Sequence, residues 1–277
     1  MIPTALSIAG SDPSGGAGIQ ADLKTFSAHG IYGMSAITAL TVQNTQGVSG
    51  IELLPAAFVA AQIDALFEDI RIDAIKIGMI ANAQIAHAVA DVLKQHTQTP
   101  IILDPVMIAK GGHSLLEEDA ITAVQQHLLP LADILTPNLE EAARLLDTEM
   151  ATTRTEMEAQ GRALLACGPR AVLMKGGHLE GDESPDLLIT ADSLIWYEAH
   201  RIDTQNTHGT GCTLSSAIAA QIAKGSSYEK AIEYAKSYVH GAIEAADSLH
   251  IGSGHGPTHH FHALWQRDTP KFGNSIA

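Results

Sequence analysis

Short runs of branched apolar residues alternate with longer, alanine-rich helical patterns along most of this chain of 277 residues. This alternation predicts a parallel sheet, because parallel strands need a crossover, usually a helix, between them. The expected strands cover residues 5–9, 35–42, 50–54, 74–77, 101–106, 134–136 and 171–175, with a hairpin of 187–190 and 193–200. The expected helices cover residues 19–29, 55–70, 82–96, 117–129, 155–167, 211–224 and 228–246. We therefore predict a three-layer α/β/α fold with a mostly parallel central sheet.

No linker or low-complexity stretch divides the sequence, so we predict a single domain over residues 1–277, with a histidine-rich C-terminal segment from about residue 250. A formal net charge of −15 argues against nucleic acid or an anionic membrane as the main partner. The two cysteines provide no disulfide framework, and neither a signal peptide nor a membrane-spanning apolar run is evident. These features predict a cytoplasmic protein that binds small molecules.

Glycine, proline or polar residues follow five of the predicted strands. They lie in the segments 10–12, 76–79, 104–107, 136–138 and 174–178. In parallel sheets, ligands bind where the carboxyl ends of the strands meet the loops. Because those ends share one edge of the sheet, we expect the five segments to line a common crevice.

The segment Asn-Thr-His-Gly-Thr-Gly-Cys at residues 206–212 runs directly into a helical pattern. Its two glycines allow the backbone to bend and to approach a ligand closely. The helix start directs free amides and the positive end of the helix dipole at one point, which favours an anion such as a phosphoryl group in transfer. Cys212 lies in the first helical turn, where we expect the pKa of its thiol to fall below the free value of about 8.5. The alternative is a glycine-rich turn with a small buried thiol.

Two other motifs carry weaker signals. Residues 16–21 match the dinucleotide pattern GxGxxA, but the preceding strand ends too early and no acidic ribose ligand follows the next strand. Neither a Walker A motif nor the protein-kinase motifs occur. Four histidines in the C-terminal segment suggest a metal site, but they have neither a helical spacing nor a nearby cysteine or carboxylate to complete it: His255, His259, His260 and His262. We interpret these four histidines as part of a solvated or docking tail and not as a metal site.

Taken together, the informative segments resemble the bacterial hydroxymethylpyrimidine/phosphomethylpyrimidine kinases of thiamine biosynthesis, a branch of the ribokinase-like superfamily. The resemblance rests on residues 8–22, 38–44, 76–79, 104–107, 136–141, 175–178 and 209–212 and covers nearly the whole chain. It implies a ribokinase-like fold. Many sugar-kinase relatives carry aspartate at the base position where this chain has Cys212.

The resemblance also implies an activity. It is the Mg-ATP-dependent phosphorylation of 4-amino-5-hydroxymethyl-2-methylpyrimidine to its monophosphate, and of the monophosphate to the diphosphate. A homodimer is implied as well. Pyridoxal kinase is the nearest alternative, alone or as a second activity, because vitamin B6 also carries a hydroxymethyl group on an aza-aromatic ring. A catalytically silent binding protein is a further alternative, which the intact Gly-Thr-Gly-Cys segment at residues 209–212 and Lys175 disfavour.

For the pyrimidine, the resemblance implies a pocket at the first strand ends. The carboxamide of Gln43 matches a ring nitrogen beside an exocyclic amine, because it offers a donor and an acceptor at once. Gly10 lets the ring approach the backbone, and Asp22 contacts its polar edge. Met79 and Val106 cover its faces.

For ATP, the resemblance implies a phosphate site at the elbow, a name we use for residues 209–212. The residues placed around the phosphates are Asn138, Lys175, Thr207, Gly209, Thr210 and Gly211. Cys212 is the expected general base, and Lys175 and both elbow glycines complete the catalytic group. We expect Lys175 to serve turnover more than folding. Asp104 and Glu141 are expected to orient Mg²⁺, directly or through water.

Overall fold

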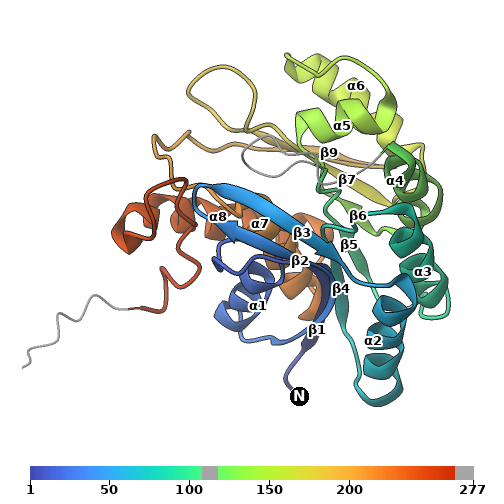
Figure 1. Cartoon of the computed structure of the whole chain (residues 1–277). Helices are drawn as coiled ribbons and strands as arrows, with labels where there is room; N and C mark the ends of the chain where they lie inside the picture. Colours follow the sequence, from blue (N-terminus) through green and yellow to red (C-terminus); the bar gives the residue numbers. More distant parts are fainter. Residues whose placement is uncertain (108–117, 266–277) are drawn as a thin grey trace, which may run out of the picture.

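The computed structural model describes residues 1–107 and 118–265. Their strands form one nine-stranded sheet in the order β3-β2-β1-β4-β5-β6-β7-β8-β9 (Figure 1). The strands are β1 (Thr4–Ser11), β2 (Tyr32–Asn44), β3 (Gly47–Leu53), β4 (Ala74–Ile77), β5 (Ile101–Leu103), β6 (Ile134–Leu135), β7 (Ala171–Lys175), β8 (Asp186–Thr190) and β9 (Leu194–Tyr197). Across the sheet, the neighbouring strands from β2 through β1, β4, β5 and β6 to β7 pair in parallel. At the two edges, β3 pairs antiparallel with β2, and β8 and β9 also pair antiparallel.

Helices cover both faces of this sheet (Figure 1). They are α1 (Gly18–Ala28), α2 (Ala56–Asp69), α3 (Ala83–Leu93), α4 (Glu118–Ala123), α5 (Leu139–Leu146), α6 (Arg154–Leu165), α7 (Thr210–Ala223) and α8 (Tyr228–Glu244). Helices α1, α7 and α8 share one apolar core with the sheet, and α2 to α6 share the other. The prediction of a three-layer α/β/α fold with a mostly parallel sheet is confirmed.

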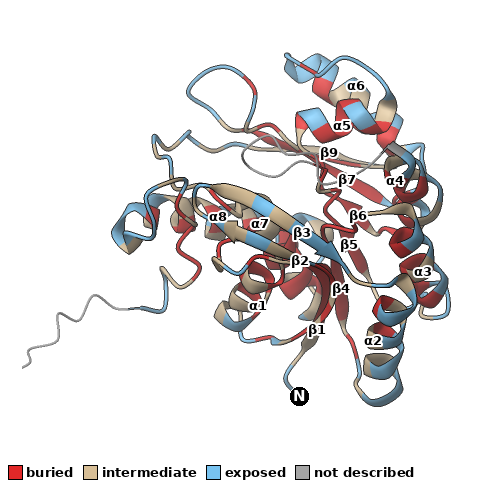
Figure 2. Cartoon of the chain, viewed as in Figure 1, coloured by how far each residue is buried: buried red, intermediate tan, exposed pale blue. Residues whose placement is uncertain are grey.

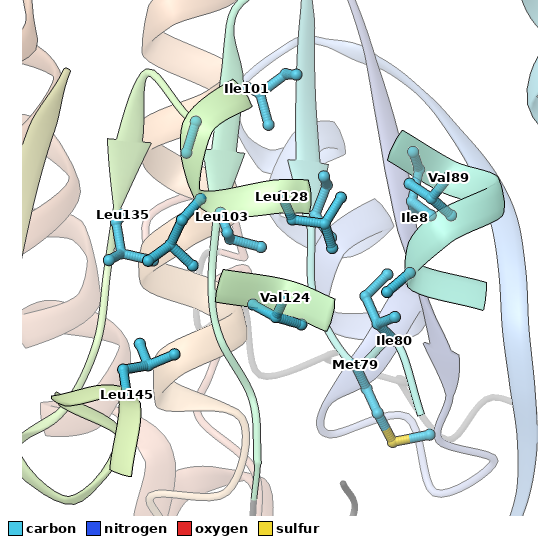
Figure 3. Close-up of a cluster of buried hydrophobic side chains, with 14 of the residues drawn as sticks. Ile8, Met79, Ile80, Val89, Ile101, Leu103, Val124, Leu128, Leu135 and Leu145 are labelled. Atoms are coloured by element: carbon cyan, nitrogen blue, oxygen red, sulfur yellow. The ribbon is translucent and has the colours of Figure 1, made fainter. Parts of the chain in front are cut away.

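Neighbouring residues of the central strands enter opposite cores. Ile101 and Leu103 of β5 pack on the side of α3, whereas Ile102 between them packs on the side of α7. Figure 3 shows the first of these cores, in which Leu103 lies near Val124 and Leu128. Side chains alternate across a strand, so a strand covered on both faces must be apolar throughout. This explains the unbroken apolar runs in the sequence and the buried strands in Figure 2.

Two of the expected elements differ from the prediction. Strand β5 ends at Leu103 and not at residue 106, because Pro105 has no backbone N–H to donate to a neighbouring strand. The helix expected over 117–129 is α4, followed by a π-helical turn over Val124–Leu128 and a 3₁₀ turn over Leu129–Leu131 that contains Pro130. Residue 117 lies outside the described residues.

Helix α5 was not predicted, although its first residues carry a start signal. Asn138 Oδ1 accepts a hydrogen bond from the Glu141 amide at 2.8 Å, and Glu141 Oε2 accepts one from the Asn138 amide at 2.7 Å. This reciprocal pair is a capping box, in which two helix-start amides find acceptors. The spacing Asn-x-x-Glu before an apolar run is its mark in the sequence.

The described part of the C-terminal segment docks on the body of the protein. The amide of His255 donates to the Thr45 carbonyl at 2.8 Å, and that of Thr258 donates to the His208 carbonyl at 3.2 Å. Thr258 and His260 are buried. The sequence analysis offered a solvated tail or a docking segment, and the docking segment is correct for residues 250–265. Residues 266–277 lie outside the described residues.

No described helix is long and apolar enough to cross a membrane.

Candidate active site

A cavity of about 1060 Å³ opens at the carboxyl ends of the parallel strands. All five strand-end segments contribute to its lining, as expected. From these segments it takes Gly10, Ser11, Asp12, Lys76, Met79, Asp104, Val106, Asn138, Lys175, Gly177 and His178, and Gln43 and all four elbow residues line it too. The volume lies just above the usual range for small-molecule sites, about 300–1,000 Å³.

The elbow requires glycine at its first position. Gly209 is the N-cap of α7 and has φ +80°, in the left-handed region. A Cβ built there would lie 1.8 Å from the carbonyl oxygen of Gly16, so no side chain fits. The elbow therefore packs directly on the loop that follows β1, and it brings the start of α7 to the centre of the cavity.

Cys212 lines the cavity, but the expectation about its thiol is wrong. Burial raises the pKa of Cys212 to about 11, and the nearby carboxylates of Asp22 and Asp104 raise it further against the opposing charge of Lys76. Loss of hydration disfavours a thiolate more than the helix start favours it. In the absence of ligands, Cys212 is a neutral thiol at pH 7.

Lys175 joins two carboxylates beside the elbow. Its Nζ lies 2.9 Å from Asp104 Oδ1 and 3.5 Å from Glu141 Oε2. Burial alone would raise the pKa of Asp104, but the charges of Lys175 and Lys76 outweigh it and hold this pKa below its usual value. Burial and the neighbouring Asp104 raise the pKa of Glu141 to about 7. Because Lys175 pairs with buried carboxylates, it also contributes to the fold, and the expectation that it serves turnover more than folding stays a prediction.

Asp22 lies beneath the cavity and does not line it. Its two oxygens are each 3.0 Å from Lys76 Nζ, and both side chains are fully buried. The hydroxyl groups of Ser7 and Ser216 donate to the same carboxylate at 2.6 and 2.7 Å. The prediction that Asp22 contacts a ligand is therefore replaced by a supporting role, in which it holds the Lys76 ammonium at the cavity wall.

The end of the cavity at β2 carries a hydrogen-bonded group that the sequence analysis only partly identified. Gln43 lies between Thr41 and His208. The Gln43 Oε1 atom is 3.1 Å from Thr41 Oγ1, and the Gln43 Nε2 atom is 3.3 Å from His208 Nε2. His208 Nε2 is also 2.8 Å from Asp12 Oδ2. His208 and Asp12 were quoted within motifs but given no role, because 196 positions separate them along the chain.

The sequence analysis did not predict the opposite end of the cavity, which lies beyond β7. It is lined by residues 199–204, by Asp186 of β8 and by one face of α8, including Lys236, Val239 and Ile243. Lys236 Nζ pairs with Asp186 Oδ2 at 2.6 Å. The guanidinium of Arg201 donates to carbonyls of the loop after β7, including that of Gly177 at 2.7 Å. No local pattern marks these residues, because only the tertiary fold brings α8 beside β8.

Comparison with known proteins gives consistent matches. A family model described as phosphomethylpyrimidine kinase matches residues 12–259. The hydroxymethylpyrimidine/phosphomethylpyrimidine kinase of Salmonella typhimurium is 54% identical over 94% of this chain and 98% of its own length. The Escherichia coli protein of that name is 53% identical with the same coverage.

Solved structures agree with this relationship. A phosphomethylpyrimidine kinase from Clostridium difficile is 44% identical, covers 88% of this chain and 100% of its own, and superposes with a TM-score of 0.78. An ADP complex of Bacillus subtilis pyridoxal kinase is 34% identical, covers 96% of this chain and 100% of its own, and has a TM-score of 0.89.

Proposed function

This chain belongs to the phosphomethylpyrimidine kinase family, and on that premise we propose that it uses ATP to phosphorylate hydroxymethylpyrimidine and then its monophosphate, in thiamine biosynthesis. The observation that carries the proposal is the position of the elbow within a single cavity. The Gln43 end of the cavity lies on one side of the elbow, and the end at β8 and α8 lies on the other. An acceptor and a nucleotide bound at these two ends meet at the elbow.

The residues at the meeting point suit phosphoryl transfer. The transferred group is anionic, and the amides at the start of α7 together with Lys175 supply positive charge where it passes. Asn138, Thr207 and Thr210 also line this part of the cavity. The chemistry needs little beyond positioning and charge neutralisation, which these rigidly held groups provide.

Asp104 and Glu141 suit Mg²⁺ held mainly by phosphate oxygens and water. Magnesium in nucleotide sites commonly takes one or two protein carboxylates, and these two carboxylates both face Lys175. Among residues 1–107 and 118–265, no group of three or more histidine, cysteine, aspartate or glutamate side chains is arranged to hold a metal by itself. When bound with ATP, Mg²⁺ neutralises phosphate charge.

Pyridoxal is the second candidate acceptor, because a pyridoxal kinase shares this fold over almost the whole chain. A coupled assay with the pyrimidine alcohol, its monophosphate and pyridoxal offered separately tests both candidates. We expect turnover with both pyrimidines. Turnover with pyridoxal alone would replace the proposed function by vitamin B6 phosphorylation.

Replacing Gln43 by leucine should weaken use of the pyrimidine alcohol. The change leaves a ring nitrogen and an amine without partners in a largely enclosed pocket. We expect kcat/KM to fall about 5- to 150-fold, or roughly 1–3 kcal/mol. Steady-state kinetics at saturating Mg-ATP measure the effect, and an unchanged kcat/KM would remove Gln43 from the acceptor site.

Gly211→Ala should impair transfer without unfolding the protein. A Cβ at this position would lie 3.4 Å from Lys175 Nζ and 3.6 Å from Asp104 Oδ2, which are ordinary contacts, so the fold tolerates it. The added methyl group occupies the space in which the phosphoryl group passes. We expect kcat to fall on the order of 10²-fold, comparable to loss of one stabilising donor. A thermal melt near that of the wild type, measured alongside kcat, is part of the prediction.

A homodimer in the cytoplasm is the expected setting. Leu40, Val42, Ile51 and Leu53 of β2 and β3 are exposed apolar residues at the edge of the sheet and support an interface there. Cys167 and Cys212 are free thiols, in keeping with a reducing compartment. Light scattering after gel filtration measures the oligomeric state directly.

A further inference from the structure

Gln43, Thr41, His208 and Asp12 form a continuous hydrogen-bonded chain at the acceptor end of the cavity. Asp12 and His208 are both buried, with 3% and 8% of their surface exposed. The Asp12 carboxylate also accepts from the amides of Ser14 and Ala17, each at 2.8 Å. Burial opposes its negative charge, but the bonds from His208 and Ser14 outweigh that effect and hold the pKa of Asp12 below its usual value.

The carboxylate determines where the proton on His208 lies. A carboxylate only accepts hydrogen bonds, so His208 Nε2, 2.8 Å from Asp12 Oδ2, must carry a proton. A protonated ring nitrogen cannot accept from a carboxamide N–H. An N–H of Gln43 on that side would face the N–H of His208, so the carboxamide is better placed with its oxygen there, where it shares the single Nε2 proton with Asp12. This placement is a half turn of the carboxamide from the one with Nε2 toward His208.

The other end of the carboxamide agrees with this orientation. The Thr41 hydroxyl donates to the Ser11 carbonyl at 2.9 Å, and its remaining lone pairs face Gln43. An N–H of the turned carboxamide donates to Thr41 Oγ1. The His208 Nε2–H, one N–H of the carboxamide and the Thr41 hydroxyl then each have an acceptor between Asp12 and Ser11.

We propose that the Asp12–His208 pair is a positioning unit that holds the Gln43 oxygen toward His208 and the Gln43 nitrogen toward Thr41, and so decides which way round the pyrimidine ring binds. The inference rests on the proposed function. The amine of the substrate then lies at the His208 side, and the adjacent ring nitrogen lies at the Thr41 side. Because the hydroxymethyl group is next to the amine on the ring, it points toward the elbow that begins one residue after His208.

The test compares two acceptor rings in His208→Leu and His208→Gln. The first ring is the natural 4-amino alcohol, and the second is its 4-oxo analogue, whose N–H and carbonyl reverse the donor and acceptor positions. The wild type should strongly prefer the amino ring. His208→Leu frees the carboxamide to turn, so the ratio of kcat/KM for the amino ring to that for the oxo ring should fall at least about tenfold. His208→Gln keeps an N–H near the Asp12 carboxylate and should retain most of the preference.

Thr41→Val provides a second variant that does not touch the elbow. It removes the acceptor at the other end of the carboxamide and should lower the same ratio. Equal losses with both rings in His208→Leu, or an unchanged ratio in Thr41→Val, would overturn the proposal and leave His208 as a support for the elbow. Failure of the wild type to phosphorylate the amino alcohol would instead overturn the proposed function.

Discussion

Replacing Cys212 by alanine is expected to slow phosphorylation of hydroxymethylpyrimidine by about 10²- to 10⁴-fold, the range of general-base help, and phosphorylation of its monophosphate much less. The alcohol is a poor nucleophile until its proton is removed. The monophosphate has a second pKa of about 6 and is already largely a dianion at neutral pH. The second step therefore needs positioning and charge neutralisation, but no base.

The raised pKa of Cys212 gives this prediction a pH signature. With a thiol pKa of about 11, the reactive thiolate is a small fraction at pH 7 and increases about tenfold for each pH unit. The first step of the wild type should therefore accelerate between pH 6.5 and 9, whereas the second step should change little. In Cys212→Ala the acceleration of the first step should disappear.

Purified enzyme assayed on each acceptor separately, with saturating Mg-ATP, measures these effects. Cys167→Ala is the matched control, because Cys167 is an exposed thiol and does not line the cavity. It should behave as the wild type on both acceptors. Equal losses on the two acceptors in Cys212→Ala would show that Cys212 shapes the elbow or contacts the phosphoryl group, and is not a base.

Replacing Lys76 by methionine is expected to destabilise the protein by about 3–5 kcal/mol, because it leaves the carboxylate of Asp22 buried without a counter-ion. Both side chains of this ion pair are fully buried, so Asp22 would be left with little hydration to offset the lost ammonium. For a chain of this size the melting temperature should fall by roughly 5–15 °C. Circular dichroism or calorimetry without ligands measures the change.

A second substitution separates charge from packing. Asp22→Asn in the Lys76→Met background removes the unpaired charge and keeps an oxygen that accepts from Ser7 and Ser216. The double variant should therefore melt above Lys76→Met alone. If Lys76→Met melts within about 2 °C of the wild type, a loss well below 1.5 kcal/mol, the buried pair does not hold the fold as described.

The layers of the fold were predictable because local patterns of apolar residues indicate the strands and helices that form them. Strands covered on both faces are apolar throughout, and helices repeat their apolar residues every three to four positions, so both classes of element are visible in a short window. The departures also have local causes. Pro105 ends β5 early, and the capping box of Asn138 and Glu141 begins α5 where no helix was expected.

By itself, the sequence determined that five strand-end segments and the elbow reach the cavity, but not its end at β8 and α8. Parallel topology brings the carboxyl ends of strands to one edge, so the motifs after β1, β4, β5, β6 and β7 meet there whatever their separation in the chain. Only the tertiary structure decided which charges pair, as in Lys76 with Asp22 and His208 with Asp12. It also reversed the expected shift in the pKa of Cys212. The physical reason is that ion pairing and desolvation depend on what packs across a gap in space, which no short stretch of sequence records.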